Sequence, residues 1–106
     1  MFDEQNQLCG RRAGRDGAPE MVCPSPGTYA LAFSGVHVIS GRFLGMLSEN
    51  GVFSIITAYL RLAGEREKIL GFRADEFYWR DLGRPENVLQ AARDIESGVI
   101  DICKRL

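Results

Sequence analysis

The segment from Tyr29 to Ile39 reads Tyr-Ala-Leu-Ala-Phe-Ser-Gly-Val-His-Val-Ile, and this segment decides the expected fold. Almost all of its residues are apolar or small, and Val36, Val38 and Ile39 are β-branched, which favours an extended strand. A continuous apolar run is typical of a strand covered on both faces, as in a parallel or mixed sheet. The segment therefore predicts a central strand, which needs paired neighbours on both sides.

Three stretches have the apolar spacing of helices. They cover residues 41–47, with Ser40 as the cap, then about Ser54 to a stop at Gly64, and residues 85–95. Proline suits a first helical turn because its missing N–H has no partner there. The expected buried faces consist of Phe43, Leu44 and Leu47 in the first helix, Ile55, Ile56, Tyr59, Leu60 and Ala63 in the second, and Val88, Leu89, Ala92 and Ile95 in the third.

Shorter strands are expected around these helices. Residues 2–8 predict a hairpin with a polar turn, and residues 68–72 and 77–80 predict two further strands. Alternating strands and helices indicate an α/β layered domain, with residues 1–28 as hairpin and loop and residues 29–97 as the α/β body. A central strand with so few other strands leaves this sheet short of partners.

Composition sets limits on the class of protein. The chain has 106 residues, which fit one domain, and its apolar fraction of 45% and charged fraction of 25% are those of a soluble globular protein. A net charge of −1 provides no general attraction to nucleic acid or anionic lipid. No apolar run approaches the roughly 18 residues of a membrane span, and the N-terminus lacks the regions of a signal peptide. We therefore expect no nucleic-acid partner and no membrane association.

The cysteines indicate a reducing compartment. Cys9, Cys23 and Cys103 are odd in number and widely spaced, so they predict reduced thiols in a cytoplasmic protein. They lack the close pairing of a zinc site, and the presence of a single histidine, His37, argues further against one.

The run from Glu76 to Glu86, Glu-Phe-Tyr-Trp-Arg-Asp-Leu-Gly-Arg-Pro-Glu, is the most informative about function. It reads as an aromatic strand that ends at Asp81, followed by a turn at Gly83 and a helix that opens at Pro85. In open α/β sheets, ligands bind at the carboxyl ends of strands, so Asp81 is a candidate ligand-binding residue. The alternative is that Asp81 only caps a turn, since aspartate and glycine are ordinary turn residues.

Three segments, in this order, resemble the C-terminal part of the sugar-1-phosphate nucleotidyltransferases. They are Phe33 to Ser40, Phe53 to Leu60, and Trp79 to Glu86. The resemblance is greatest to the bacterial branch of mannose-1-phosphate guanylyltransferases and N-acetylmuramate-1-phosphate uridylyltransferases, and it covers about Phe2 to Ala92. It implies the C-terminal, sugar-phosphate-binding part of a Rossmann-like, three-layer mixed-sheet fold that is incomplete in residues 1–106, which form a single partial domain.

The resemblance also implies a reaction. In that family a sugar 1-phosphate attacks the α-phosphorus of a nucleoside triphosphate, Mg²⁺ lies between the two polyanions, and a nucleoside-diphosphate sugar forms. Asp81 matches the second of two aspartates that share the metal, and Ser34 and Gly35 match the strand end that lines the sugar-phosphate pocket. No residue of this chain matches a catalytic residue of another kind. Which sugar and which base are used stays open, as does the oligomeric state.

The family's phosphate-binding loop and first metal-binding aspartate have no counterpart in this sequence. We therefore expect a C-terminal portion of a longer transferase, inactive as an isolated chain and without appreciable Mg²⁺ affinity. The alternative is a non-catalytic α/β module that serves dimerisation or regulation.

Several of these residues have simpler interpretations beside the functional ones. Gly35 could relieve crowding in a buried strand rather than admit a substrate. His37 is more often a satisfied core residue than a base when it stands alone in an apolar strand. Arg80 and Arg84 could contact phosphate oxygens, although solvated surface arginine is the default.

Overall fold

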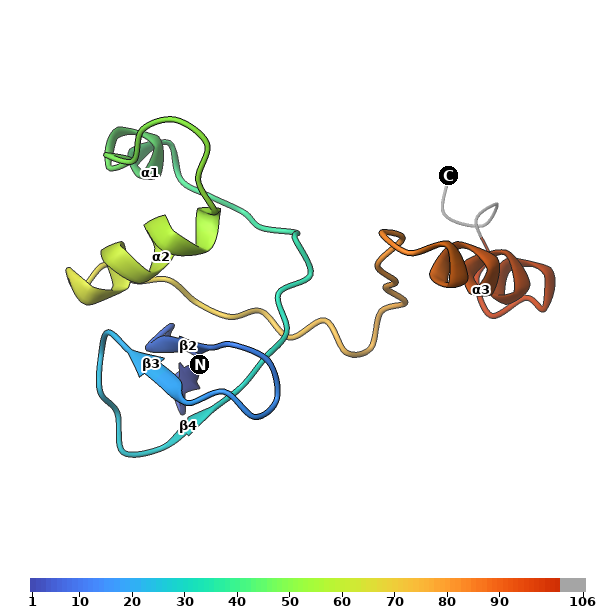
Figure 1. Cartoon of the computed structure of the whole chain (residues 1–106), viewed down its shortest axis with the longest axis horizontal. Helices are drawn as coiled ribbons and strands as arrows, with labels where there is room; N and C mark the ends of the chain where they lie inside the picture. The colour runs from blue at the N-terminus through green and yellow to red at the C-terminus, as the bar shows by residue number, and fades with distance from the viewer. Residues whose placement is uncertain (102–106) are drawn as a thin grey trace. The chain divides into compact units, whose positions relative to one another are not determined.

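Short strands and helices alternate with irregular stretches through residues 1–101, the part of the chain that the computed structural model describes (Figure 1). Two compact units are present, Met1–Arg73 and Ala74–Leu106. The elements of the first unit are β1 (Phe2–Asp3), β2 (Gly10–Arg12), β3 (Pro19–Met21), β4 (Thr28–Tyr29), α1 (Gly41–Gly45) and α2 (Ile55–Gly64). The second unit contains α3 (Pro85–Glu96).

The two sheets of the first unit are both antiparallel and two-stranded. One pairs β1 with β4, with Phe2 opposite Tyr29, and the other pairs β2 with β3, with Gly10 opposite Met21. The expected mixture of helices and strands is thus confirmed, at a much smaller strand content than the sequence predicts. A single partial domain, with its boundary after residue 28, stays a prediction.

The predicted N-terminal hairpin is present. Phe2 and Leu8 form an antiparallel bridge, and the Asp3 carboxylate accepts hydrogen bonds from the main-chain N–H groups of Gln5 and Gln7, each at 2.9 Å. Asn6 takes a left-handed conformation with φ of 61°. Asparagine tolerates this region better than most residues, which explains why the polar turn forms here.

The predicted central strand is wrong. Only Tyr29 belongs to a strand, β4, and residues 30–39 are irregular and largely exposed, with Val36 at 75% and Val38 at 100%. A strand is stabilised by hydrogen bonds to its neighbours, and no neighbouring strand runs beside residues 30–39 in the described part of the chain. The segment is apolar as expected, but composition alone does not supply sheet partners.

The strands predicted over residues 68–72 and 77–80 are wrong for the same reason. Leu70 makes an isolated bridge with Gln7, and residues 77–80 form no ladder. Phe72 remains 83% exposed. The expected layered α/β sheet is therefore replaced by two small antiparallel sheets in the first unit.

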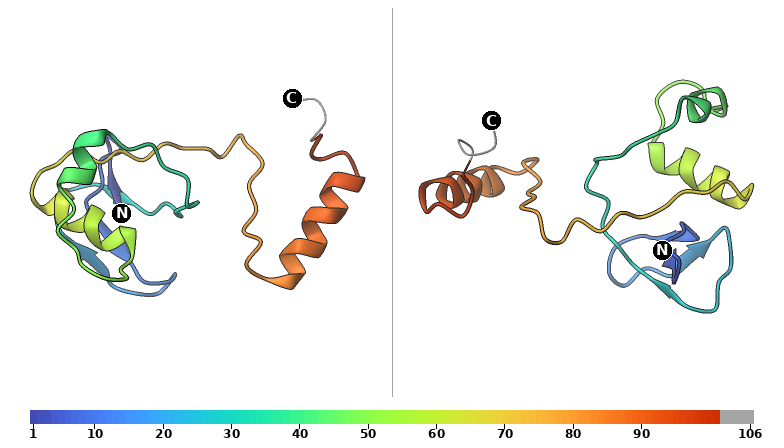
Figure 2. Two further views of the ribbon diagram at one scale, coloured as in Figure 1. Left: turned by 90° about the horizontal axis from the view of Figure 1, so that it is seen from above. Right: turned by 180° about the vertical axis from the view of Figure 1, so that it is seen from behind.

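Helix α2 carries the buried core of the first unit, and in the right-hand view of Figure 2 the segment after the helix runs between it and the small strands. Ser54 caps it as expected, its hydroxyl accepting a hydrogen bond from the Ile56 N–H at 3.3 Å. The helix ends at Gly64, also as expected. Its buried residues are Ala58, Tyr59, Leu60, Leu62 and Ala63, and Cys9 joins them from the hairpin side.

Arg61, a residue of α2, holds the segment before the helix against it. Its guanidinium donates to both carboxylate oxygens of Glu49, at 2.7 and 3.1 Å, and to the Met46 carbonyl at 2.9 Å. Because of these hydrogen bonds, Arg61 lowers the pKa of Glu49 to about 2. A bidentate pair of this kind fixes geometry as well as charge.

Helices α1 and α3 keep their predicted positions but not their predicted burial. Helix α1 contains no buried residue, and the side chain of its cap, Ser40, makes no capping hydrogen bond. In α3 the expected apolar stripe is exposed, with Leu89 at 63% and Ile95 at 44%. Residues 102–106 lie outside the described residues. Among the helices of residues 1–101, none combines the length and apolar character needed to span a bilayer.

Candidate functional site

Asp81 lies in an exposed turn that leads into α3. Its carboxylate Oδ1 accepts a hydrogen bond from the Gly83 N–H at 2.9 Å, which closes a short turn before Arg84, the residue that precedes the helix. Pro85 occupies the start of α3, as predicted. Asp81 therefore caps the turn, as one of the two interpretations expected. Its carboxylate is also exposed, so its other oxygen is accessible to a ligand.

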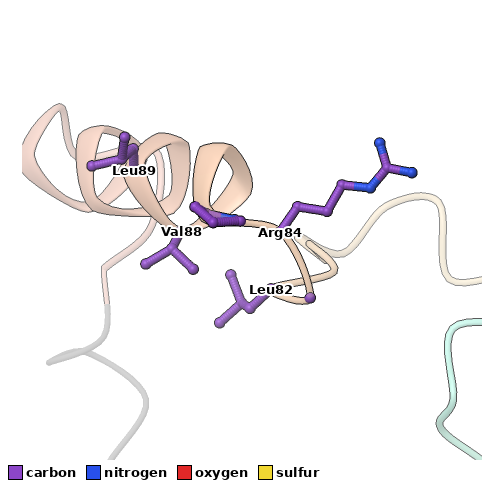
Figure 3. Close-up of a pocket in the computed structure, with 6 residues that line it drawn as sticks. Leu82, Arg84, Val88 and Leu89 are labelled. Atoms are coloured by element: carbon purple, nitrogen blue, oxygen red, sulfur yellow. The ribbon is translucent and has the colours of Figure 1, made fainter.

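An open groove of about 550 Å³ adjoins this turn in the second unit. It is lined by Leu82, Gly83, Arg84, Pro85, Val88 and Leu89. Figure 3 shows Leu82 and Val88 projecting to the same side, whereas the guanidinium of Arg84 extends away from them. The groove is therefore mainly apolar, and a charged ligand would meet it only at its edge.

A second feature of this unit is a polar cluster that joins Tyr78 and Arg80 to α3. Asp94, 9% exposed, accepts hydrogen bonds at Oδ2 from the Tyr78 hydroxyl and the Arg80 guanidinium, each at 2.7 Å. Its Oδ1 accepts from the Gln90 amide at 2.8 Å. Arg80 is therefore engaged in an ion pair rather than standing as a solvated arginine. The cluster was not predicted, and its one signal in the sequence is the i, i+4 spacing of Gln90 and Asp94.

This cluster predicts a pH-dependent stability of the second unit. Hydrogen bonds, the largest from Tyr78, hold the pKa of Asp94 below its ordinary value of 3.8. A carboxylate whose pKa is depressed in the folded state stabilises the fold at pH values above its ordinary pKa. This stabilisation is lost as the pH falls from the ordinary pKa through the lower pKa of the folded state. We expect acid to release Tyr78 and Arg80 from α3, measured by Trp79 fluorescence and far-ultraviolet circular dichroism.

Asp94→Asn is the informative variant for this prediction. It should abolish most of the acid-dependent change, whereas Glu96→Gln, an exposed position on the same helix, should leave the change intact. An acid transition of equal size in Asp94→Asn would contradict the assignment of this titration to Asp94.

Ser34 and Gly35 lie in an exposed bend of the first unit. The Ser34 hydroxyl accepts from the Val36 N–H at 3.4 Å, and Gly35 has φ of 80° with open space where a Cβ would be. Both sequence interpretations of Gly35 assume a strand, and that assumption is wrong. Here the glycine is needed for its left-handed backbone, which other residues adopt at a cost. Whether Ser34 and Gly35 bind a sugar phosphate stays a prediction.

His37 contacts the aromatic side of α2. Its Nδ1 lies 2.9 Å from the Tyr59 hydroxyl, and its ring lies 5.9 Å from the rings of both Phe33 and Tyr59. Burial raises the pKa of Tyr59. The histidine thus has a hydrogen-bond partner and ring neighbours, but it is exposed and lies in no strand, so its expected place in the core is wrong.

Magnesium is the cofactor implied by the resemblance, and the described residues fit it only in part. Mg²⁺ takes one or two carboxylates together with phosphates and water, and Asp81 offers an accessible carboxylate oxygen. Within residues 1–101 no group of three or more histidine, cysteine, aspartate or glutamate side chains gathers as a metal site. Ser34 and Gly35 belong to the first unit, and Asp81 belongs to the second.

Comparison of the chain with protein-family models, curated proteins and solved structures finds no match.

Proposed function

We propose that this chain is the C-terminal part of a sugar-1-phosphate nucleotidyltransferase and forms part of its sugar-phosphate and metal site. Three segments of the sequence resemble the family and occur in the same order as in the family, which supports this proposal. The observation that carries it is the placement of Asp81, an accessible carboxylate in the turn that opens α3. Asp81 is one of two carboxylates for Mg²⁺, and Ser34 and Gly35 contact the sugar phosphate. Nucleoside triphosphate and sugar 1-phosphate are the substrates.

When bound, Mg²⁺ supplies positive charge that offsets the charge of the reacting phosphates. Asp81 would help to hold the ion, while its Oδ1 keeps the turn closed on the Gly83 N–H. The sugar phosphate is already an anion, so the reaction needs no base, and His37 can remain hydrogen-bonded to Tyr59.

Exposed apolar side chains support the proposal that residues 1–106 form only part of a larger fold. Val38, Val52 and Phe72 are 100%, 107% and 83% exposed, so these apolar side chains are left uncovered by the described residues. Strands from the missing half would pair with residues 30–39 and 77–80 and complete a Rossmann-like, three-layer mixed sheet in a cytoplasmic enzyme.

A reconstitution experiment tests the proposal. The purified chain, incubated with GTP, mannose 1-phosphate and Mg²⁺, should form no nucleoside-diphosphate sugar above the level of Asp81→Ala. Co-expressed with the N-terminal half of a mannose-1-phosphate guanylyltransferase, it should form a complex and restore product, detected by anion-exchange chromatography. Product from the isolated chain would overturn the predicted inactivity, and absence of any complex with such halves would overturn the family assignment.

The second candidate is a non-catalytic dimerisation or regulatory module. The exposed apolar stripe of α3, with Val88 at 48% and Leu89 at 63%, favours it. The DNA upstream of Met1 separates the two proposals. An in-frame extension that encodes a glycine-rich loop and an aspartate-bearing strand supports the transferase, whereas a stop codon and a separate ribosome-binding site support the module, whose dimer would be measured by analytical ultracentrifugation.

A further inference from the structure

Cys9 and Cys23 are hydrogen-bonded through their main chains just beyond the end of the β2–β3 ladder. Cys9 directly precedes β2, and Cys23 follows β3 by one intervening residue, Val22. The Cys9 carbonyl accepts hydrogen bonds from the N–H groups of both Val22, at 2.8 Å, and Cys23, at 3.0 Å. The Cys9 carbonyl is thus a shared acceptor that holds the main chain of Cys23 close to that of Cys9.

Covalent geometry then brings the two residues within disulfide range. A main-chain hydrogen bond of 3.0 Å from Cys23 to Cys9 limits the separation of their Cα atoms to about 7 Å, because the connecting bond lengths are fixed. A disulfide needs Cα atoms no farther apart than about 7 Å. Both residues carry free thiols in the structure.

The environments of the two thiols differ. Cys9 is 2% exposed, and its S–H donates to the Gln7 carbonyl at 3.3 Å, whereas Cys23 is half-buried. Burial is the main cause that raises the pKa of Cys9, and the charges of Asp3 and Cys23 add to it. Cys23 is thus the thiol that a reagent in solution reaches first.

We propose that Cys9 and Cys23 are a redox modification site that forms a reversible disulfide with a low-molecular-weight disulfide such as glutathione disulfide. The Cys23 thiolate attacks one sulfur of glutathione disulfide and releases one glutathione. Cys9 then loses its proton and attacks the Cys23 sulfur of the mixed disulfide, which releases the second glutathione. The two cysteines lose two hydrogen atoms and two electrons, and one glutathione disulfide becomes two glutathione thiols.

The cross-link closes the β2–β3 hairpin where that hairpin meets the core of the first unit. The Met1 amino group donates to the Gly10 carbonyl at 2.7 Å, and the Cys9 N–H donates to the Met1 carbonyl at 2.9 Å. On the other side, Val22 lies near Gly64, the last residue of α2. A cross-link restricts the unfolded chain, so the oxidised unit resists unfolding more than the reduced one.

The test uses the full chain with Cys103→Ser, so that only the two proposed thiols remain. After incubation with glutathione disulfide at neutral pH, both free thiols should disappear and the mass should fall by two hydrogen atoms. Tryptic peptides that contain Cys9 and Cys23 should be joined until a reductant is added. The yield should be independent of protein concentration, and the rate should increase with pH because the raised pKa of Cys9 limits the second step.

Cys23→Ser in the same background is the control, with circular dichroism as the check that the fold is retained. It should gain no cross-link, and its melting temperature should not increase with oxidant, whereas that of the parent should. A lasting glutathione adduct on Cys23, disulfide-linked dimers, or two free thiols after incubation would each overturn the proposal.

Discussion

Leu62→Ala should destabilise the first unit more than any other single truncation in α2. Leu62 is 1% exposed and is the largest fully buried side chain described. Truncation of a buried leucine to alanine costs about 2–5 kcal/mol, because contacts are lost and a cavity remains. At about 1.4 kcal/mol for each factor of ten, the unfolding equilibrium should shift roughly thirtyfold or more. Amide hydrogen exchange in α2, measured by NMR, reports this shift without interference from α3.

Leu44→Ala is the matched control for this prediction. The same atoms are removed from the same unit, but Leu44 is 61% exposed, so little contact is lost. Exchange protection in α2 should stay close to that of the parent chain. Equal loss of protection in the two variants would mean that α2 does not carry the core of this unit.

Asp81→Asn should abolish most of the transferase activity of the reconstituted enzyme. The substitution removes the negative charge that the proposed metal site requires, while its amide oxygen can still accept the hydrogen bond from the Gly83 N–H. Charge stabilisation by a bound metal is worth several kcal/mol, so we expect a loss of kcat on the order of a hundredfold or more. The measurement is the rate of nucleoside-diphosphate sugar formation at saturating Mg²⁺.

Comparison with Asp81→Ala separates the two roles of this side chain. If Asp81 binds the metal, Asn and Ala should lower kcat to a similar extent. If Asp81 only caps the turn, Asn should retain activity and Ala alone should lose it, because only Ala removes the acceptor for Gly83. Glu86→Gln, which removes a nearby charge from the first turn of α3, should retain most of the activity.

Local signals in the sequence were sufficient to predict the helices. Ser54 and Gly64 bound α2 where expected, and Pro85 opens α3. These features depend on capping groups and backbone preferences within a few residues, so neighbouring sequence specifies them. The hairpin after Phe2 follows from the same kind of local chemistry, through the Asp3 carboxylate and the left-handed Asn6.

The predicted strands failed because strand formation depends on distant partners. Residues 30–39 have strand-like composition, yet no ladder forms beside them within residues 1–101. The candidate site shows the same difference between local and distant contacts. The turn closed by Asp81 and Gly83 could be predicted from adjacent residues, whereas the hydrogen bonds that gather Tyr78 and Arg80 on Asp94 could not.

The sequence alone predicts the positions of α2 and α3, the polar hairpin turn and the turn at Asp81 before α3. Only the tertiary structure decided which of the predicted apolar faces are buried, that Cys23 is hydrogen-bonded to Cys9, and that Arg61 pairs with Glu49. Caps and turns are determined by short-range contacts. Burial, strand pairing and ion pairs depend on segments that are distant in the sequence and meet only when the chain folds.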